Sequence, residues 1–525
     1  MPQTSKAAFP LSPSIVVLLT LVVGLTACAS RTAAPYVRPA HEFALPAQSD
    51  DAFVEIESTI YLKHGPVASG FKLLDSNEDG LRWRLALIDS ARHSIDVQYY
   101  LWYGDDAGRI LARRLLDAAN RGVRVRMLVD DLNTLFTDAG SIAMRDKIAA
   151  LMDAHPNLEL RLFNPWTNRE IAGRISEGMG EFKRVNQRMH NKVMIVDNRA
   201  TIIGGRNIGD EYMGLHDEFN FHDLDVLGIG PVARQASTKF DAYWNSDWVM
   251  PVSTLNIEVS ADEQEEALAG LIQQNNAAAS LAYFEKDPQT WSAELVGLHD
   301  TLHTGTSQVI SDMPTEGAIE HVMLEQIHAM IDVAQSELLI VNAYIIPTER
   351  SIAKLQMLKK RGVEVKILTN SLASHDVPAV NSHYKQWRKP ILESGAKLFE
   401  ARHDAEIQAV VSDTKPTRAK FMGLHSKAMV VDHERVFIGS MNYDPRSAMI
   451  NTEMGVFIES RALAEELAQL IERDMQPVNS WRVELDSEGE LHWINDVETV
   501  TSQPARNWWQ RVQDVIFKSV PKEYY

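Results

Sequence analysis

The sequence reads RMHNKVMIVDNRATIIGGRN at residues 188–207 and GLHSKAMVVDHERVFIGSMN at residues 423–442. Each stretch contains His-x-Lys-x-x-x-x-Asp, followed by a polar turn, an apolar run, a Gly-Gly or Gly-Ser pair, and an Asn two residues on. Each position of the second copy lies 235 residues after its counterpart. Two such patterns with the same continuation do not arise by chance. They predict a duplicated unit and a site to which both copies contribute.

The segments around these motifs predict an α/β fold in both halves. The runs SIDVQYYLW (94–102) and LLIVNAYII (338–346) have the composition of strands, and an amphipathic helical stretch follows each of them. Gly122 and Gly362 then stand where the end of a helix needs a left-handed residue. Strands that alternate with helices in this way indicate sheets covered by helical layers.

Composition excludes several classes of protein. The 525 residues are 45% hydrophobic and carry a net charge of −19, which indicates folded domains and argues against a general nucleic-acid binder. The single cysteine, Cys28, excludes an intrachain disulfide and any cysteine-based metal cluster. After the N-terminal apolar run, no stretch is long enough to predict a transmembrane helix.

The N-terminus resembles a lipoprotein signal peptide over residues 1–28. Lys6 precedes an apolar run, which ends in Leu25-Thr26-Ala27-Cys28 and looks like a bacterial lipobox with Cys28 as the lipidated residue. An ordinary signal peptide and an uncleaved anchor stay open as alternatives. The pattern predicts a protein anchored by lipid in the bacterial cell envelope and facing the periplasm. Because Ala29 rather than Asp follows the cysteine, the outer membrane is favoured over the inner membrane.

The rest of the chain divides into parts with different patterns. The expected boundaries are a tether at 29–58, a first domain at 59–252, an acidic helical connector at 253–304, a second domain at 305–476, and a C-terminal hairpin and helix at 477–525. Trp508, Trp509, Val512, Val515 and Ile516 recur at helical spacing in the C-terminal segment. This last helix can pack on the domain or lie on a membrane interface, and the sequence leaves both readings open.

The paired motifs suit the chemistry of a phosphodiester. Because side chains alternate along a strand, the His and Lys of each motif point to the same face. Lys can bind the non-bridging oxygens, while His attacks phosphorus or protonates the leaving oxygen. Two copies that face each other supply a nucleophile and a general acid, and the lysine pair takes the place of a metal ion. We therefore expect no metal and no cofactor.

The motifs resemble those of the phospholipase D superfamily over roughly residues 60–480. The second copy continues as FIGSMNYDPRSAMINTEMGVFIES (437–460), in which DPRS and NTEMG resemble the bacterial cardiolipin synthase branch, especially its lipoprotein-like phosphatidyltransferases. The resemblance implies two pseudo-twofold-related α-β-α sandwich domains with mixed or parallel sheets and a composite active site at their interface. It also implies a ping-pong reaction through a phosphohistidine.

The resemblance further implies a role for each motif residue. His190 is expected to be the nucleophile and His425 the acid and base, with the reverse assignment left open. The residues expected to bind the phosphoryl oxygens are Lys192, Lys427, Asn207 and Asn442. Asp223 and Glu453, at equivalent places before an apolar strand, are expected to orient the imidazoles. Asp197 and Asp432 are expected to hold turns. Tyr99, Tyr100, Trp102 and Tyr344 stand on strands that should border the site.

These observations predict a membrane-anchored phosphatidyltransferase that forms cardiolipin by transfer to phosphatidylglycerol, without a metal. Its partners would be the membrane, phosphatidylglycerol and a phosphatidyl donor, with no nucleic acid; the need for an accessory protein is left open. The alternative is hydrolysis of phospholipids by the same intermediate, or hydrolysis by a nuclease, which the charge disfavours. A non-catalytic envelope lipoprotein would lack a motif His or Lys, and both pairs are complete.

Overall fold

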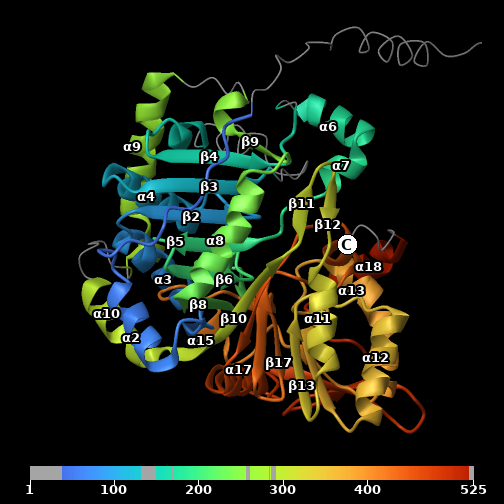
Figure 1. The fold of residues 1–525 in the computed structure, drawn as a ribbon. Helices are drawn as coiled ribbons and strands as arrows, with labels where there is room; N and C mark the ends of the chain where they lie inside the picture. The colour runs from blue at the N-terminus through green and yellow to red at the C-terminus, as the bar shows by residue number, and fades with distance from the viewer. Residues whose placement is uncertain are drawn as a thin grey trace, which may run out of the picture. The chain divides into compact units, whose positions relative to one another are not determined.

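Two sheets with the same order of strands form the frame of the unit that begins at Glu42 (Figure 1). The computed structural model describes residues 38–131, 149–167, 169, 171–255, 260–282, 284 and 291–519. Cys28 and the predicted signal peptide lie outside these residues. No helix of the described part combines the length and the apolar character that crossing a bilayer requires.

The two sheets are mixed and correspond strand by strand. The first runs β9 (Val249–Pro251), β4 (Leu158–Phe163), β3 (Arg124–Asp130), β2 (Ser94–Tyr99), β5 (Lys192–Val196), β6 (Ala200–Gly204), β8 (Asp225–Ile229) and β1 (Ser69–Leu74). The second runs β20 (Ser480–Leu485), β15 (Lys397–Ala401), β14 (Glu364–Asn370), β13 (Glu337–Asn342), β17 (Lys427–Val431), β18 (Arg435–Gly439), β19 (Met454–Glu459) and β10 (His303–Ser311). In each sheet three adjacent strands are parallel to one another and the other pairs are antiparallel. The predicted duplicated α/β fold is confirmed.

Strand β10 joins the two sheets. Its first residues pair with β1, and the residues from Thr306 to Ser311 pair with β19 of the second sheet. A second link is made by two short strands, β7 (Phe219–His222) and β16 (Phe421–Leu424), which pair in parallel across the halves. The small hairpin β11 (Met313–Thr315) and β12 (Ala318–Glu320) follows β10. The halves are therefore connected by backbone hydrogen bonds as well as by side-chain packing.

Helices cover the sheets in layers. Those of the first half are α2 (Val54–His64), α3 (Asn77–Ser90), α4 (Asp106–Asn120), α6 (Ile171–Gly180), α7 (Phe182–Asn186), α8 (Pro231–Trp244), α9 (Ala261–Ala277) and α10 (Trp291–Leu298). Those of the second half are α11 (Met323–Asp332), α12 (Glu349–Lys360), α13 (Pro378–Tyr384), α14 (Arg388–Glu393), α15 (Gln408–Val411), α16 (Pro445–Met449), α17 (Arg461–Asp474) and α18 (Trp508–Ile516).

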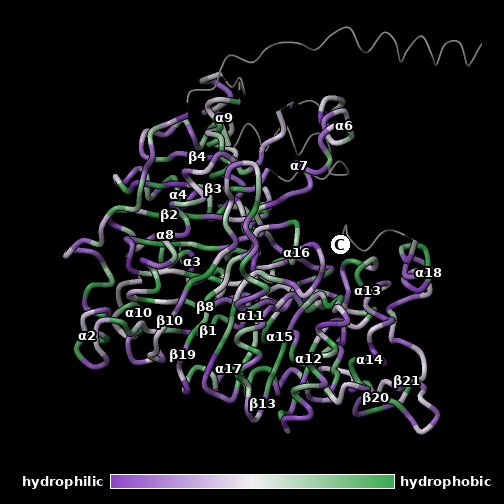
Figure 2. Tube along the Cα trace, turned by 45° about the vertical axis from the view of Figure 1, so that its right-hand side comes forward, coloured by the Kyte–Doolittle hydropathy of each residue, from purple (hydrophilic) through white to green (hydrophobic). Residues whose placement is uncertain are grey.

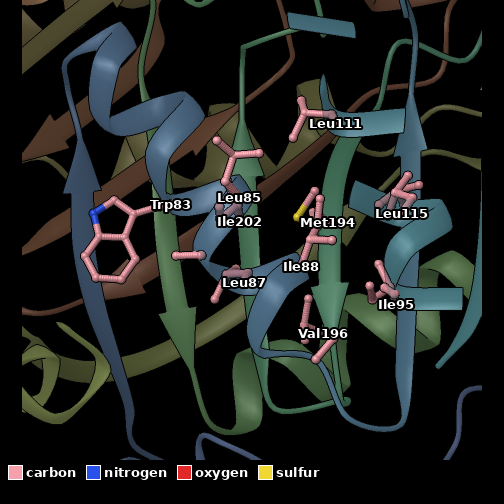
Figure 3. Close-up of a cluster of buried hydrophobic side chains, with 14 of the residues drawn as sticks. Trp83, Leu85, Leu87, Ile88, Ile95, Leu111, Leu115, Met194, Val196 and Ile202 are labelled. Carbon is pink, nitrogen blue, oxygen red and sulfur yellow. The ribbon is translucent and has the colours of Figure 1, made fainter. Parts of the chain in front are cut away.

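Three large hydrophobic clusters lie between these layers in the described part of the chain, besides a small fourth cluster around Val411. The first packs α3 and α4 on the first sheet, with Leu85, Ile88, Leu111 and Met194 of β5 in one cluster (Figure 3). The second contains the buried faces of α8 and α17 together with strands from both sheets, so this core is shared by the halves. The third packs α11, α12 and α14 on the outer face of the second sheet. Hydropathy along the trace follows the same layers, with hydrophobic residues concentrated in the strands (Figure 2).

The glycines predicted at helix ends have the expected conformation. Gly122 follows α4 with a φ of +94°, and Gly362 follows α12 with a φ of +80°. Only glycine adopts such angles without strain. These positions direct the chain back into the next parallel strand, β3 or β14.

Two tight turns follow the motif strands. Asp197 and Asn198 connect β5 to β6, and Asp432 and His433 connect β17 to β18; all four residues have φ between 51° and 53°. This is the geometry of a type I′ hairpin turn, closed by hydrogen bonds from the N–H of Arg199 and of the equivalent Glu434. The Asp197 carboxylate also accepts hydrogen bonds from the N–H groups of residues 92–94 at 2.8–3.0 Å. Asp432 does the same for residues 335–337. Each Asp thus fixes the entry to a central strand.

This geometry predicts a stability effect without a direct catalytic one. Asp197→Ala should lower the free energy of unfolding by about 2–4 kcal/mol, because three N–H groups lose their acceptor and Ala disfavours a positive φ. Unfolding in denaturant would measure the loss. Asp197→Asn is the matched control, since Asn tolerates this φ, and it should lose less stability. Full stability with abolished activity in Asp197→Ala would instead indicate contact with substrate.

The predicted tether is too long. From Glu42 onward the chain packs on the first half: the N–H of Ala44 donates to Asp241 Oδ2 at 2.9 Å, and Leu45 accepts from Asn198 Nδ2 at 3.0 Å. Helix α2 then begins at Val54, inside the range expected to be flexible. Residues such as Ala44 and Leu45 are held on the first half by hydrogen bonds of their backbone groups. Because these residues have no periodic hydrophobic pattern, composition alone indicated a tether.

The connector and the C-terminal segment each pack on the half that precedes them. The connector is helical as predicted, and α9 and α10 pack on α4 and α3 of the first half. At the C-terminus the predicted hairpin is present as β20 and β21 (Leu491–Ile494), with β22 (Thr499–Val500) beside it. Because β20 pairs with β15, the hairpin extends the second sheet and is not a separate module.

Candidate active site

The motif histidines meet the acidic residues of the opposite half. The N–H of His425 donates to the carbonyl of His222 in β7 at 2.7 Å, and the N–H of His190 donates to the carbonyl of Thr452 at 2.9 Å. Asp223 follows His222, and Glu453 follows Thr452. The backbone pairing between the halves therefore places each carboxyl group beside the imidazole of the other half.

Both imidazoles use the same nitrogen for this contact. His190 Nδ1 lies 2.9 Å from Glu453 Oε2, and His425 Nδ1 lies 2.6 Å from Asp223 Oδ2. A carboxyl group on Nδ1 fixes the orientation of the ring and leaves Nε2 for the substrate. The sequence nominated both acids, but it did not show that each one serves the other half.

The motif lysines lie buried beneath the histidines. Lys192 Nζ donates to the carbonyl of His190 at 2.7 Å, and Lys427 Nζ donates to the carbonyl of His425 and lies 2.9 Å from its Nδ1. Each ammonium also lies over an aromatic ring, Tyr100 at 5.1 Å or Tyr344 at 5.8 Å from the centroid. Burial lowers the pKa of both lysines, to about 8 for Lys427, although nearby carboxyl groups oppose the shift. Two cations at low dielectric form a strong site for an anion.

The electrostatics of the two histidines differ. Burial and the neighbouring ammonium groups of Lys192 and Lys427 lower the pKa of His190 well below 6.5, so this imidazole is neutral and its lone pair is available. Burial also raises the pKa of Glu453 well above its ordinary value. A neutral ring held by a carboxyl group suits a nucleophile.

In the pair of His425 and Asp223, the carboxyl group keeps its negative charge. Burial raises the pKa of Asp223, but His425 and Lys427 outweigh burial and hold the pKa below its usual value. Burial and Lys427 lower the pKa of His425, and the Asp223 carboxylate opposes this shift. An ionised carboxylate stabilises the imidazolium form, so His425 is the better proton donor.

The two motif copies differ at one position that affects the carboxyl groups of the two pairs differently. Ser440 Oγ donates to Glu453 Oε2 at 2.5 Å. The equivalent position in the first half is Gly205, where a Cβ would lie 2.2 Å from Asp223 Oδ1. Asp223 therefore occupies space that a serine side chain would need, and it lacks the matching hydroxyl donor.

The histidines and asparagines line one pocket of about 410 Å³. Asn207 Oδ1 accepts a hydrogen bond from the N–H of Leu101 at 3.3 Å, which directs its amide group into the site. Asn442 Oδ1 is buried, and no hydrogen bond to it is found within the described residues. An amide with unused hydrogen-bonding capacity beside two cations suits a phosphoryl group. Of the predicted aromatics, Tyr100 and Tyr344 line the pocket; Tyr99 is buried behind it against Arg84.

Charged side chains of both signs line the pocket, and Asp444 stands close to Arg446 in it. Arg446 of α16 lies on the His190 side and is held by Asn186 Oδ1 at 2.8 Å. Glu211 and Asp376 lie on the His425 side, where Asp376 Oδ2 accepts a hydrogen bond from the Tyr344 hydroxyl at 2.6 Å. Arg446, Glu211 and Asp376 were not expected at the site from the sequence. Arg446 stands in the DPRS stretch that supported the resemblance, whereas Asp376 and Glu211 have no counterpart pattern.

No metal site was found in the part of the chain that the structure describes: no group of three or more His, Cys, Asp or Glu side chains there could hold a metal ion. Arg446 lines the pocket, whereas Lys192 and Lys427 are buried beneath the two histidines and are not part of its lining. Those three cations, two amides and two imidazoles can hold a phosphodiester, attack it and protonate a leaving oxygen.

The pKa shifts predict an unusual pH dependence. A reaction in which His190 attacks phosphorus and His425 protonates the leaving oxygen, as expected from the sequence, needs a neutral His190 and a protonated His425. Because the His190 pKa is well below 6.5, the first condition already holds in acid, whereas His425 loses its proton as pH rises through its own lowered pKa. We therefore expect kcat/KM to be highest below pH 6.5 and to fall at higher pH. A bound phosphodiester adds negative charge beside Lys427, so kcat should decline only at higher pH. A kcat/KM that rises from about pH 6 to about pH 9 would contradict this assignment.

Comparison with known proteins places these features in one family. A family profile described as "Cardiolipin synthase, PLD-like domain" matches residues 85–244 and 327–475. Cardiolipin synthase C of Escherichia coli (strain K12) is 36% identical over 87% of this chain and 96% of that protein. Cardiolipin synthase A of Pseudomonas entomophila (strain L48) is 27% identical over 84% of this chain and 75% of that protein. The solved phosphatidylserine synthase of Haemophilus influenzae Rd KW20 has a TM-score of 0.52 at 14% identity, over 80% of this chain and 89% of that one, which concerns the fold alone.

Proposed function

The chain belongs to the cardiolipin synthase branch of the phospholipase D-like family, and on this premise we propose that it is a phosphatidyltransferase that forms cardiolipin. The observation that carries the proposal is the reciprocal pairing of His190 with Glu453 and of His425 with Asp223 around one pocket, with both motif lysines beneath its histidines. The acceptor is the free hydroxyl of phosphatidylglycerol. The donor is a second phosphatidylglycerol or another phospholipid.

The first half-reaction forms a phosphohistidine. Nε2 of His190 attacks the phosphorus of the donor, and the bond from phosphorus to the head-group oxygen breaks. Nε2–H of His425 gives its proton to that oxygen, so the head group leaves as a neutral alcohol. Lys192 and Lys427 neutralise the non-bridging oxygens, and Asn207 and Asn442 donate hydrogen bonds to them.

The second half-reaction transfers the phosphatidyl group. His425, now neutral, takes the proton from the hydroxyl of phosphatidylglycerol, and the oxygen attacks phosphorus. The bond between phosphorus and His190 Nε2 breaks, which releases cardiolipin and restores both histidines. Water in place of the alcohol would give phosphatidic acid. The outcome therefore depends on which nucleophile reaches the pocket.

An assay with defined lipids tests the proposed function. Purified protein is expected to convert phosphatidylglycerol, alone or with a second phospholipid, into cardiolipin, and isotope in the head group of each lipid in turn identifies the donor. Phosphatidic acid and free head group without cardiolipin would show a hydrolase instead. Thin-layer analysis of lipids from cells that express the chain or His190→Ala extends the test to the membrane.

The proposed setting is the bacterial cell envelope. Support comes from the sequence at Cys28, which predicts a lipid anchor, a periplasmic orientation and the outer membrane. An anchored chain would meet its lipid substrates at the membrane surface.

A further inference from the structure

Helix α18 is oriented with its polar side toward the protein. Gln510 and Asp514 are buried, while Trp508, Trp509, Val515 and Ile516 are 50–72% exposed. Asp514 accepts hydrogen bonds from Asn381 Nδ2 and Lys385 Nζ, both at 2.6 Å. An amphipathic helix that packed on a domain by its apolar side would show the opposite pattern. The sequence left open whether this helix packs on the domain or lies on a membrane. The helix does pack on the domain, but its apolar face stays exposed to solvent.

The helix lies beside the entrance of the active site. It packs on α13, and Val380 of α13 lines the pocket together with Val377 just before this helix. One short helix therefore separates the exposed tryptophans from the space that holds the two histidines.

Further exposed apolar side chains lie on helices that contain or contact the pocket-lining Arg446 or its neighbours. Met449 of α16 is 72% exposed, three residues after the pocket-lining Arg446. Arg446 is bonded to Asn186 at the end of α7, and the adjoining helix α6 exposes Met179 and Ile175. Figures 1 and 2 both show α6 and α7 on the same side of this unit as α13 and α18. We call the exposed apolar residues of α6, α16 and α18 the entrance surface.

The pocket itself cannot hold a whole diacyl lipid. Its volume of about 410 Å³ is too small for two acyl chains, and the charged, amide and phenol groups among its lining residues suit a phosphate and a head group. The acyl chains must then extend past the entrance and need an apolar environment. Tryptophan is enriched at membrane interfaces, and a helix with one apolar face can lie in the interface plane. Arg511 and Lys518, both exposed, add positive charge for anionic lipid.

We propose that the entrance surface docks on a phospholipid bilayer and opens the active-site pocket directly to lipids in it. This inference rests on the proposed function, because it assumes a phospholipid substrate. The contact is separate from an anchor at Cys28: the anchor would keep the chain near the membrane, and the entrance surface would orient the pocket.

Site-specific labelling tests the contact. The sequence has one cysteine, so Cys28→Ser in the full chain provides a background for single labels at Val515→Cys, Met449→Cys and Met179→Cys. An environment-sensitive fluorophore at each position should shift to shorter wavelength with vesicles of phosphatidylglycerol and phosphatidylethanolamine. Leu62→Cys on α2 is the matched control, because Leu62 is 81% exposed and α2 lies across the unit from α18 in both views. No shift at the three positions, or an equal shift at Leu62→Cys, would overturn the proposal.

A kinetic test separates docking from chemistry. Trp508→Asp with Trp509→Asp should lower turnover of vesicle-embedded phospholipid at least about tenfold and leave turnover of a monomeric short-chain phospholipid within about twofold. Both positions follow the N-cap Asn507, where acidic residues favour a helix, so α18 should persist. Equal loss on both substrates, or no loss on vesicles, would contradict docking. If the unmodified chain did not turn over the short-chain lipid, the proposed function itself would fail.

Discussion

Replacing His190 by alanine is expected to abolish phosphatidyl transfer, with a fall in kcat of at least about 10⁴-fold. The reason is that the proposed reaction has no path around the bond between phosphorus and Nε2. The neighbouring lysines and asparagines would still bind the substrate, so the affinity for phospholipid should change little. Assays with defined phospholipids and a vesicle-binding measurement would separate the two effects.

The control for this variant is a histidine outside the pocket. His155→Ala removes a side chain that contacts Asn120 and lines no part of the site, so it should keep activity within about twofold of the unmodified chain. Substantial turnover by His190→Ala would mean that His425 or water attacks phosphorus directly. The roles assigned from the two carboxyl pairs would then be wrong.

The second large effect is a dependence on the leaving group in His425→Ala. With a natural phospholipid donor, loss of the proton donor should slow the first half-reaction by about 10²–10⁴-fold. A donor whose leaving group is nitrophenol needs no proton, because nitrophenolate is stable as an anion. On that donor the variant should form the intermediate within about tenfold of the unmodified rate. A stopped-flow measurement of released nitrophenolate would determine this rate.

Asp223→Asn is the matched control variant for His425→Ala. Asp223 contacts only the Nδ1 side of His425, so the amide should retain the ring but lose the stabilisation of its charged form. This variant should be slow with the natural donor and nearly normal with the nitrophenyl donor. Equal slowing of both donors by His425→Ala would point to a role for His425 in binding or attack rather than in proton transfer.

Much of the fold could be predicted from repetition. The two motif copies, the strand-like runs before them, and Gly122 and Gly362 indicated two related α/β halves, because each feature has a local physical cause. Local patterns carry no information about which strands pair across the halves. The structure shows that β7 and β16 pair in parallel and that Met189 pairs with Thr452, and these two contacts decide which carboxyl group meets which imidazole.

At the site, too, local patterns identified residues but not the pairings across the halves. The duplicated pattern was sufficient to nominate His190, His425 and their lysines. Asp223 and Glu453 could be nominated as equivalents, but their exchange between halves could not, because either arrangement satisfies the same spacing. Asp376 reaches the pocket only through the loop after β14, which has no sequence signal. The tether was overestimated because hydrogen bonds from irregular backbone leave no periodic pattern.

Mapping the covalent intermediate shows whether His190 attacks phosphorus. His425→Ala would be mixed with a nitrophenyl phosphatidyl donor, quenched, digested and analysed by mass spectrometry. We expect a phosphatidyl group on the peptide that contains His190, absent when His190 is also replaced by alanine. An unmodified His190 peptide during turnover, or an adduct on His425 in the unmodified chain, would contradict attack by His190.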